Sequence, residues 1–265
     1  MKENVKMYFL SFADKRYSTK RIREEALSAD CFEEVLVENE DDFEDWYKKK
    51  YQNRFCDRGF GYWQWKSYRI RRLLEKMGED EVLVYLDAGC HLNTLLGGGK
   101  LLKIRLLGYI KEAPIALFQS NAPEYEWTKG DIYNFFASIG YDTRIKNQLQ
   151  GGVIILRKNF YTTQLIDNWF YICHNHYHLI NDEDSKYPNS EDFIENRHDQ
   201  AVFSILANQY HCTYWPISEI WTNSNWEDLA DKPIWVIRSK EENVPFSKKI
   251  KRKLKRIIKR ILKFF

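Results

Sequence analysis

The sequence has no apolar run that approaches the roughly 20 residues needed to cross a bilayer. The opening stretch MKENVKMYFLSFADKR holds too few apolar residues for a secretory signal and predicts a first strand instead. The five cysteines form no CxxC pair, and their odd number and scattered positions indicate reduced thiols in a cytoplasmic protein. The sequence also lacks a GxxxxGKS/T phosphate loop, a GxGxxG fingerprint and a GxSxG elbow.

What the chain does have is a large apolar and aromatic content. Of its 265 residues, 44% are hydrophobic and 16% aromatic, enough for one large globular domain with a core. Apolar, β-branched runs alternate with amphipathic segments, which predicts an α/β domain with a mostly parallel central sheet flanked by helices. The predicted strands are 5–13, 33–38, 81–87, 114–120, 151–157 and 233–238. The predicted helices are about 18–29, 43–54, 64–77, 100–112, 129–138, 159–177 and 197–209, and the polar stretch 181–197 predicts a long surface loop.

Charge is distributed unevenly along the chain. There are 41 Lys and Arg against 38 Asp and Glu, but ten of the basic residues fall in 247–265, which contains no acid. The remaining 31 basic and 38 acidic residues give the body a formal net charge of −7. These features predict an acidic domain over 1–246 followed by a basic tail over 247–265.

The basic tail has the pattern of an amphipathic helix. Its apolar residues recur at steps of three and four, framed by cations that include Lys249, Lys253, Arg256 and Arg260. This composition is typical of a helix on an anionic membrane surface, where each nearby cation contributes roughly 1 kcal/mol. A last helix docked on the domain and a basic arm for nucleic acid are the alternatives. From the composition of the tail we expect a membrane-surface partner, and because the acidic body would repel phosphate we expect no nucleic acid.

The stretch EVLVYLDAGCHLN contains a buried-looking strand that ends on Asp87 and continues into Ala88 and Gly89. In open α/β sheets, ligands bind at the carboxyl ends of the strands, so this carboxylate is expected to point into a crevice. Small residues beside it let the backbone approach a ligand closely. Such a carboxylate suits a divalent cation or the hydroxyls of a ribose or sugar. The alternative is an aspartate that merely caps the next turn.

Four segments together resemble a group of small bacterial polysaccharide glycosyltransferases with the GT-A fold. They are GFGYWQWKSYRI (59–70), YLDAGC (85–90), LQGGVIILRKN (149–159) and RHDQAVFSIL (197–206). The group commonly carries a Gly-Tyr-Trp-x-Trp-Lys-Pro-Tyr stretch followed by Asp-Ala-Gly-Cys. The resemblance covers about 5–240 and implies a GT-A-like, Rossmann-like sheet.

The resemblance also implies a surface that binds the nucleotide-sugar donor. The residues matched to it are Ser11, Ala13, Tyr62, Trp63, Lys66, Asp87, Ala88, Gly89, Gln150, Gly151 and Gly152. Lys66 opens a predicted helix among aromatic residues, where a lysine can neutralise phosphate as a point charge. Two structural alternatives stay open: aromatic core packing with Lys66 reaching out to solvent, and a simple bulge or turn at the two adjacent glycines.

Metal binding is implied by the same family. In GT-A enzymes an Asp-x-Asp motif holds the metal and the donor, and Asp87 matches its first aspartate, so Mn²⁺ or Mg²⁺ is the expected cofactor. Gly89 stands at the second position, and Ser67 replaces the usual proline. Either Asp87, a later residue and the diphosphate hold a cation, or a basic group such as Lys66 takes the metal's place.

The segment RHDQ is the candidate for the chemical step. The resemblance implies that Asp199 faces the anomeric carbon and takes the proton of the acceptor hydroxyl in an inverting reaction. His198 is expected to orient Asp199 or to take its role. The alternative is that Asn196 or Asp199 only caps the helix that begins here.

The implied activity is transfer of a sugar from a nucleotide-sugar donor, with UDP-sugar expected, to a saccharide acceptor. The acceptor is expected to be lipid-linked, as in lipopolysaccharide or capsule assembly, with the protein held at the inner face of the cell membrane. Two alternatives are an inactive nucleotide- or saccharide-binding protein on the GT-A scaffold and a nucleic-acid-binding protein acting through the tail.

Overall fold

The computed structural model describes residues 5–223 and 226–237. Its centre is a seven-stranded mixed sheet with the order β2-β1-β3-β7-β5-β6, in which β8 pairs with β5. The strands are β1 (Met7–Phe12), β2 (Glu34–Glu38), β3 (Val82–Leu86), β5 (Ile115–Pro123), β6 (Asn147–Leu149), β7 (Val153–Arg157) and β8 (Thr213–Pro216). Five of them run in one direction, while β6 and β7 are antiparallel to their neighbours. The predicted mostly parallel α/β sheet is thus confirmed.

Alternation along the strands creates a core on each face of the sheet. In β3, Leu83 and Tyr85 belong to one buried cluster, whereas Val82, Val84 and Leu86 belong to the other. This follows from the period of two, which turns successive side chains to opposite faces. Because every residue of β3 is buried, the strand is apolar throughout rather than alternating with polar residues.

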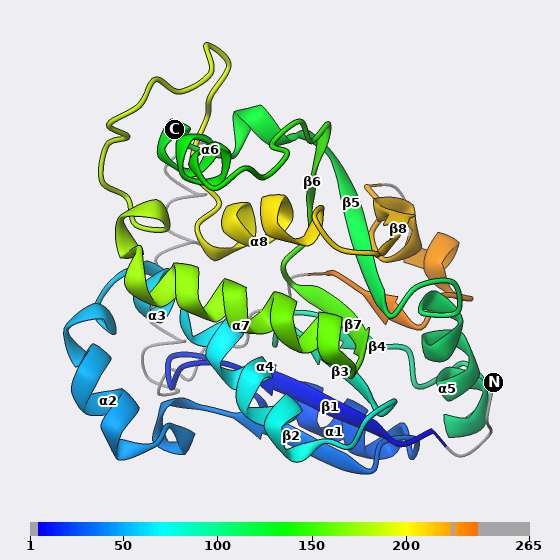
Figure 1. Cartoon of the computed structure of the whole chain (residues 1–265). Coiled ribbons are helices and arrows are strands. Elements are labelled where there is room, and N and C mark those ends of the chain that lie inside the picture. The colour runs from blue at the N-terminus through cyan, green and yellow to red at the C-terminus, as the bar shows by residue number, and fades with distance from the viewer. Residues whose placement is uncertain (1–4, 224–225, 238–265) are drawn as a thin grey trace, which may run out of the picture.

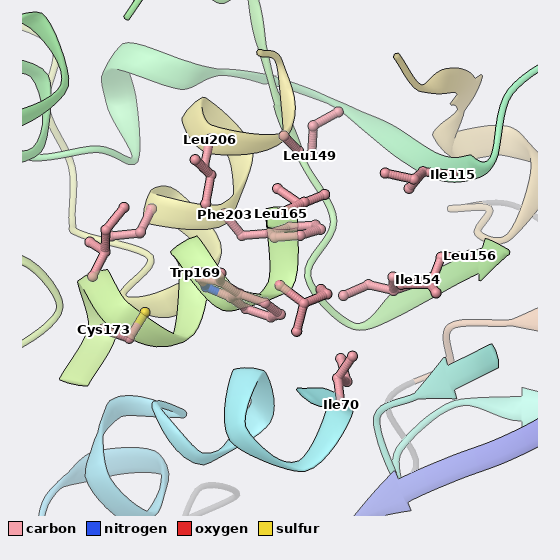
Figure 2. Close-up of a cluster of buried hydrophobic side chains, with 14 of the residues drawn as sticks. Ile70, Ile115, Leu149, Ile154, Leu156, Leu165, Trp169, Cys173, Phe203 and Leu206 are labelled. Carbon is pink, nitrogen blue, oxygen red and sulfur yellow. The ribbon is translucent and has the colours of Figure 1, made fainter. Parts of the chain in front are cut away.

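Helices cover both faces of the sheet (Figure 1). On one face lie α4 (Trp65–Lys76), α7 (Phe160–Asn175) and α8 (Asp199–Ala207), and on the other lie α1 (Lys20–Ser28) and α5 (Gly99–Tyr109). Figure 2 shows how side chains of α7 and α8 meet between the helices and the sheet, with Trp169 and Phe203 at 4.4 Å between ring centroids. The Trp169 indole N–H also donates to the Asp199 carbonyl at 3.1 Å, which holds the start of α8 against α7.

The remaining elements are shorter. They are α2 (Asp45–Tyr51), α3 (Arg58–Tyr62), α6 (Gly130–Ser138), β4 (His91–Leu92), β9 (Ile234–Trp235) and 3₁₀ turns at Glu40–Asp42, Gln52–Arg54, Glu124–Glu126, Tyr177–Leu179, Ile217–Glu219 and Trp226–Leu229. All seven predicted helices are present. All six predicted strands are present too, but 233–238 forms only β9, which pairs with β4 outside the central sheet. The predicted loop 181–197 has no helix or strand.

Within 5–223 and 226–237, no helix has both the length and the apolarity to cross a membrane. The predicted membrane-facing residues Lys249, Lys253, Arg256 and Arg260, and with them the whole tail 247–265, lie outside the described residues.

Candidate functional site

The end of β3 is where the chain brings the predicted site residues together. Leu86 pairs with Val153 at the start of β7, so the next residue, Asp87, lies beside Gly152 and its backbone N–H donates to the Gly152 carbonyl at 2.8 Å. A Cβ at position 152 would lie 2.9 Å from Asp87 Oδ2, closer than real Cβ atoms come. Only glycine therefore lets the carboxylate occupy this position.

Lys66 projects into this place from the first turn of α4. Its Nζ donates to the Gly151 carbonyl at 3.0 Å and lies 3.3 Å from Asp87 Oδ1 and 3.4 Å from Asp199 Oδ2. The residue is buried, so the alternative in which it reaches outward to solvent is wrong. Two carboxylates supply the countercharge that a buried ammonium requires.

Burial sets the protonation behaviour of this cluster. It raises the pKa of Asp199 to about 7, with the nearby Asp87 adding to the rise and Lys66 opposing it. Burial also acts to lower the pKa of Lys66, but the two carboxylates outweigh it and hold that pKa above its usual value. Tyr85 donates its hydroxyl to Asp87 Oδ1 at 2.6 Å, and burial keeps its pKa well above normal. The two carboxylates thus favour the charged form of Lys66, while burial brings the pKa of Asp199 to about 7.

The segment before α4 has an unusual backbone. All residues of 59–63 have positive φ, from +48° to +89°, so α3 contains a left-handed turn instead of regular helix. Left-handed geometry costs roughly 1–2 kcal/mol for each non-glycine residue, and here Phe60, Tyr62 and Trp63 adopt it. Gly59 is required at its position because a Cβ there would lie 2.5 Å from the Trp63 ring. Strain of this kind is concentrated at functional sites in proteins.

The left-handed turn places two of its three aromatic residues, Tyr62 and Trp63, against His198. The His198 ring lies 4.9 Å from the Tyr62 ring and 5.4 Å from the Trp63 ring, between centroids. Its Nδ1 pairs with the Ile180 carbonyl at 2.7 Å, and burial lowers its pKa. His198 is itself in a strained conformation, with φ 56°. It therefore fixes the chain immediately before Asp199.

Helix α8 has His198 as its N-cap residue and Asp199 as its first residue. The expectation that Asn196 or Asp199 caps this helix is therefore not what the structure has. Asn196 donates to the Leu179 carbonyl, and the Asp199 carboxylate reaches Lys66. The tight turn after β3 is likewise closed by the backbone of Asp87, whose carbonyl accepts from Cys90 N–H, and not by its side chain.

The loop that follows Asp87 is held by α1. Arg21 donates to the carbonyl of Ala88 at 2.7 Å and to that of Cys90 at 2.9 Å. Glu25, one turn further along α1, accepts from Leu92 N–H at 3.0 Å. This clamp orders the loop through Gly89 and was not predicted, because only the folded chain brings α1 beside it.

A buried amide chain supports the other side of the site. Gly151 N–H donates to Gln200 Oε1 at 3.1 Å, Gln200 Nε2 donates to Gln148 Oε1 at 2.7 Å, and Gln148 Nε2 donates to Glu124 Oε1 at 3.2 Å. Burial raises the pKa of Glu124, which also accepts from Thr128 and Ser204. This network was also missed, although Gln200 stands next to Asp199 in the predicted motif.

The remaining predicted residues lie along the same edge of the sheet. Leu10 pairs with Tyr85, so Ser11 and Ala13 at the end of β1 lie near Asp87, but both are buried. The Ser11 hydroxyl has no hydrogen-bond partner among the described residues. Gln150 is tied into the sheet by its backbone N–H, which donates to the Phe118 carbonyl at 2.8 Å.

The donor set around Asp87 does not fit a metal site. One of its oxygens is already bound by the Tyr85 hydroxyl and faces Lys66. No group of three or more His, Cys, Asp or Glu suited to a metal occurs in the parts of the chain that the structure describes. The Lys66 ammonium lies between the two carboxylates, which is where a cation would be bound.

Comparison with known proteins extends this description. No family model and no curated protein matches the chain. A glycosyltransferase involved in the glycosylation of the major capsid of PBCV-1 superposes with a TM-score of 0.50 at 11% identity, over 87% of this chain and 92% of that one. The glycosyltransferase GlyE of Streptococcus pneumoniae gives 0.43 at 11% identity, over 89% and 55%. The galactosyltransferase LgtC gives 0.37 at 13% identity, over 86% of each chain. The first of these likenesses shows that the chain has the fold of the PBCV-1 protein.

Proposed function

We propose that the protein is a glycosyltransferase that moves a sugar from a nucleotide-sugar donor, a UDP-sugar, to a saccharide acceptor. The observation that supports this most is the buried Lys66 ammonium between Asp87 and Asp199 at the carboxyl end of β3. Ligands bind at this edge of open α/β sheets, and a fixed cation there meets the charge that develops on a leaving diphosphate. The fold shared with the PBCV-1 glycosyltransferase supports the same class of chemistry.

The exposures suggest a division of roles within the cluster. The Asp87 side chain is 41% exposed, whereas those of Lys66 and Asp199 are 4% exposed. We propose that Asp87 binds the hydroxyls of the donor, because a carboxylate accepts hydrogen bonds from hydroxyl groups. Lys66 turns toward the diphosphate when the donor binds. Asp199 then loses its counterion, and its affinity for a proton rises.

In an inverting transfer, the acceptor oxygen bonds to the anomeric carbon while the bond from that carbon to the diphosphate oxygen breaks. The electron pair leaves with the diphosphate, and Asp199 takes the hydroxyl proton. A pKa of about 7 suits a general base at neutral pH. His198, packed against Tyr62 and Trp63, acts as a positioning residue for the start of α8. The other residues matched to the donor surface are proposed contacts of the same ligand.

Because the donor set does not fit a metal, we propose that Lys66 supplies the positive charge and that transfer proceeds without a metal ion. The expected Mn²⁺ or Mg²⁺ at Asp87 stays the competing prediction. Turnover that EDTA abolishes and Mn²⁺ restores would favour the metal.

We further propose that the acceptor is lipid-linked, as in lipopolysaccharide or capsule assembly. The tail 247–265, with ten cations and no acid, would hold the acidic domain at the inner face of the cell membrane. Such tethering raises the local acceptor concentration without a new contact at the site. Flotation with anionic liposomes of the full chain and of a chain ending at 246 tests this. Equal flotation of both would contradict it.

The experiment that tests the activity is nucleotide release from a panel of UDP-, GDP- and CMP-sugars, with Mn²⁺ and with EDTA. We expect slow hydrolysis of one donor, abolished by Asp87→Asn. The competing function is an inactive nucleotide- or saccharide-binding protein, which the burial of Asp199 favours. That function predicts thermal shifts with a donor but no turnover, even when lipid-linked saccharides are added.

A further inference from the structure

A cavity of about 610 Å³ lies at the opposite end of the sheet from the candidate site. It forms where β5 begins, since Ile115 in its lining pairs with Leu156 near the end of β7, while Asp87 lies beside the start of β7. The two places are also at opposite ends of α8, whose nine residues span about 13.5 Å at a rise of 1.5 Å per residue. Figure 1 shows α7 and α8 side by side along this length.

The cavity is lined by aromatic and amide side chains. The lining residues are Pro114, Ile115, Tyr141, Tyr161, Gln164, Gln209, Tyr210 and His211. None is an Asp, Glu, Lys or Arg. Asp142, which follows Tyr141 in the sequence, is paired with Arg144 at 2.9 Å. A volume of this size is in the range of ligand pockets, roughly 300–1,000 Å³.

Helix α7, which provides one wall, is unusually poor in charge for a surface helix. Among its 16 residues Asp167 is the one Asp, Glu, Lys or Arg, and it is bound by Arg71 at 2.7 Å. Yet Phe160 and Tyr161 at its start are 71% and 65% exposed. Surfaces normally carry roughly a quarter or more charged residues. Of these two exposed aromatic residues, Tyr161 lines the cavity, where its ring is available to a ligand.

The other wall is held in place by hydrogen bonds. The Gln209 amide bonds to both backbone groups of Asp142, accepting from its N–H at 3.2 Å and donating to its carbonyl at 2.7 Å. Asn168 of α7 donates to the Tyr210 hydroxyl at 2.9 Å. These bonds fix the separation of the two walls, so the cavity is formed before any ligand arrives.

We propose that this cavity binds a neutral oligosaccharide. The electron-rich faces of tyrosine rings attract the C–H groups of a pyranose, and tyrosine, glutamine and histidine edges hydrogen-bond its hydroxyls. An anionic ligand would find no Lys or Arg in the lining, and a purely apolar one would cover the polar edges of Tyr141, Tyr161, Gln164 and His211 without a hydrogen bond to them. The inference goes beyond the proposed transfer, because this subsite would hold part of a saccharide chain away from the reacting centre.

Binding of maltohexaose, cellohexaose, chitohexaose and laminarihexaose to the full chain tests the proposal, by saturation-transfer NMR and calorimetry. We expect one of them to bind, and Tyr161→Ala and Gln164→Ala each to weaken it, the former at least about fivefold. Tyr171→Ala is the matched control, since Tyr171 is 57% exposed on the same helix but outside the cavity. The hexasaccharide affinity of the Tyr171→Ala variant should equal that of the unaltered protein.

Asp87→Asn separates this proposal from the proposed function. Hexasaccharide binding retained in that variant supports a separate subsite, whether or not the protein transfers sugar. Three results would overturn it: no hexasaccharide bound at millimolar concentration, equal weakening by Tyr161→Ala and Tyr171→Ala, or binding lost in Asp87→Asn. The last would place the saccharide in the candidate site instead.

Discussion

Helix α4 carries two buried cations one turn apart, Lys66 and Arg69, and each lies between two carboxylates from other parts of the chain. Both side chains are positively charged and both are buried. They differ in how well their hydrogen-bonding capacity is used, and that difference separates a structural ion pair from a site open to a ligand.

The Arg69 cluster is closed. Its guanidinium binds both oxygens of the buried Glu38, with Nε donating to Oε2 at 2.5 Å, and it also lies 3.4 Å from Glu44. Glu44 in turn accepts from Tyr68 at 2.6 Å and from Arg72 at 2.9 Å. The planar fork of arginine matches a carboxylate in this bidentate way. Nothing in this cluster is left for an incoming group.

The Lys66 cluster is open. Its ammonium makes a hydrogen bond to the Gly151 carbonyl, but the two carboxylates lie at 3.3 and 3.4 Å, beyond strong charge-assisted distances. The Asp87 side chain is partly exposed, so the cluster reaches solvent. A lysine is a point charge on a flexible stem and can turn to a new anion. Loose pairing, rather than burial or charge alone, therefore distinguishes the Lys66 cluster from the Arg69 cluster.

Lys66→Met should give the largest effect. Loss of a preorganised charge that stabilises a transition state costs about 10²–10³-fold in turnover. The fold should survive, because Asp199, with its pKa of about 7, can take a proton once its cation is gone. Donor turnover at pH 7 checks the predicted loss of activity, and the melting temperature at the same pH checks that the fold is retained. Full turnover in the methionine variant would remove Lys66 from the mechanism.

Arg69→Met should show the reverse behaviour. Breaking a buried ion pair by removing one partner costs about 3 kcal/mol of the free energy of unfolding, and Glu38 and Glu44 would both lose their bond to Arg69. Turnover per folded molecule should change little, since Arg69 pairs with Glu38 and Glu44 and with neither Asp87 nor Asp199. Urea denaturation measures the first quantity and donor turnover the second. If Lys66→Met destabilises more than Arg69→Met, the distinction between the clusters fails.

Sequence reasoning predicted the fold because the central strands are apolar on both faces and end in recognisable residues. Asp87 directly follows β3, and β7 begins after two glycines; both features can be read from the sequence without knowledge of the tertiary structure. β4, β6 and β8 were missed because they have two to four residues, and β8 ends in a proline. Such short edge strands form only when a neighbour is already in place.

At the site, strand ends and the family resemblance predicted the residues that meet, Lys66, Asp87, Gly152 and Asp199. They could not predict the left-handed turn over 59–63, because three of its five residues are aromatic and only the two glycines hint at positive φ. Nor could they predict Arg21 or Gln148, whose partners are far away in sequence. Those contacts depend on packing between elements.

The smallest expected effect is a pH dependence that belongs to the Lys66 cluster alone. A general base acts when deprotonated, so turnover should fall about tenfold per pH unit below the pKa of Asp199, near 7. The same pKa shift also determines how the free energy of unfolding changes with pH. Because the folded pKa lies above the unfolded value of 3.8, the stabilisation from Asp199 is present at low pH and is lost as pH rises through about 7.

The pH profile of kcat/KM in the unaltered protein and in Arg69→Met checks this prediction, with donor binding followed in parallel to exclude an effect on affinity. Both proteins should share one acidic limb, since Arg69 touches neither Asp87 nor Asp199. A flat profile through pH 7 would mean that Asp199 does not act as the base. A limb that shifts in Arg69→Met would show that the two clusters are coupled through α4. Lys66 and Arg69 would then have to be treated as one electrostatic unit rather than as a binding site beside a structural pair.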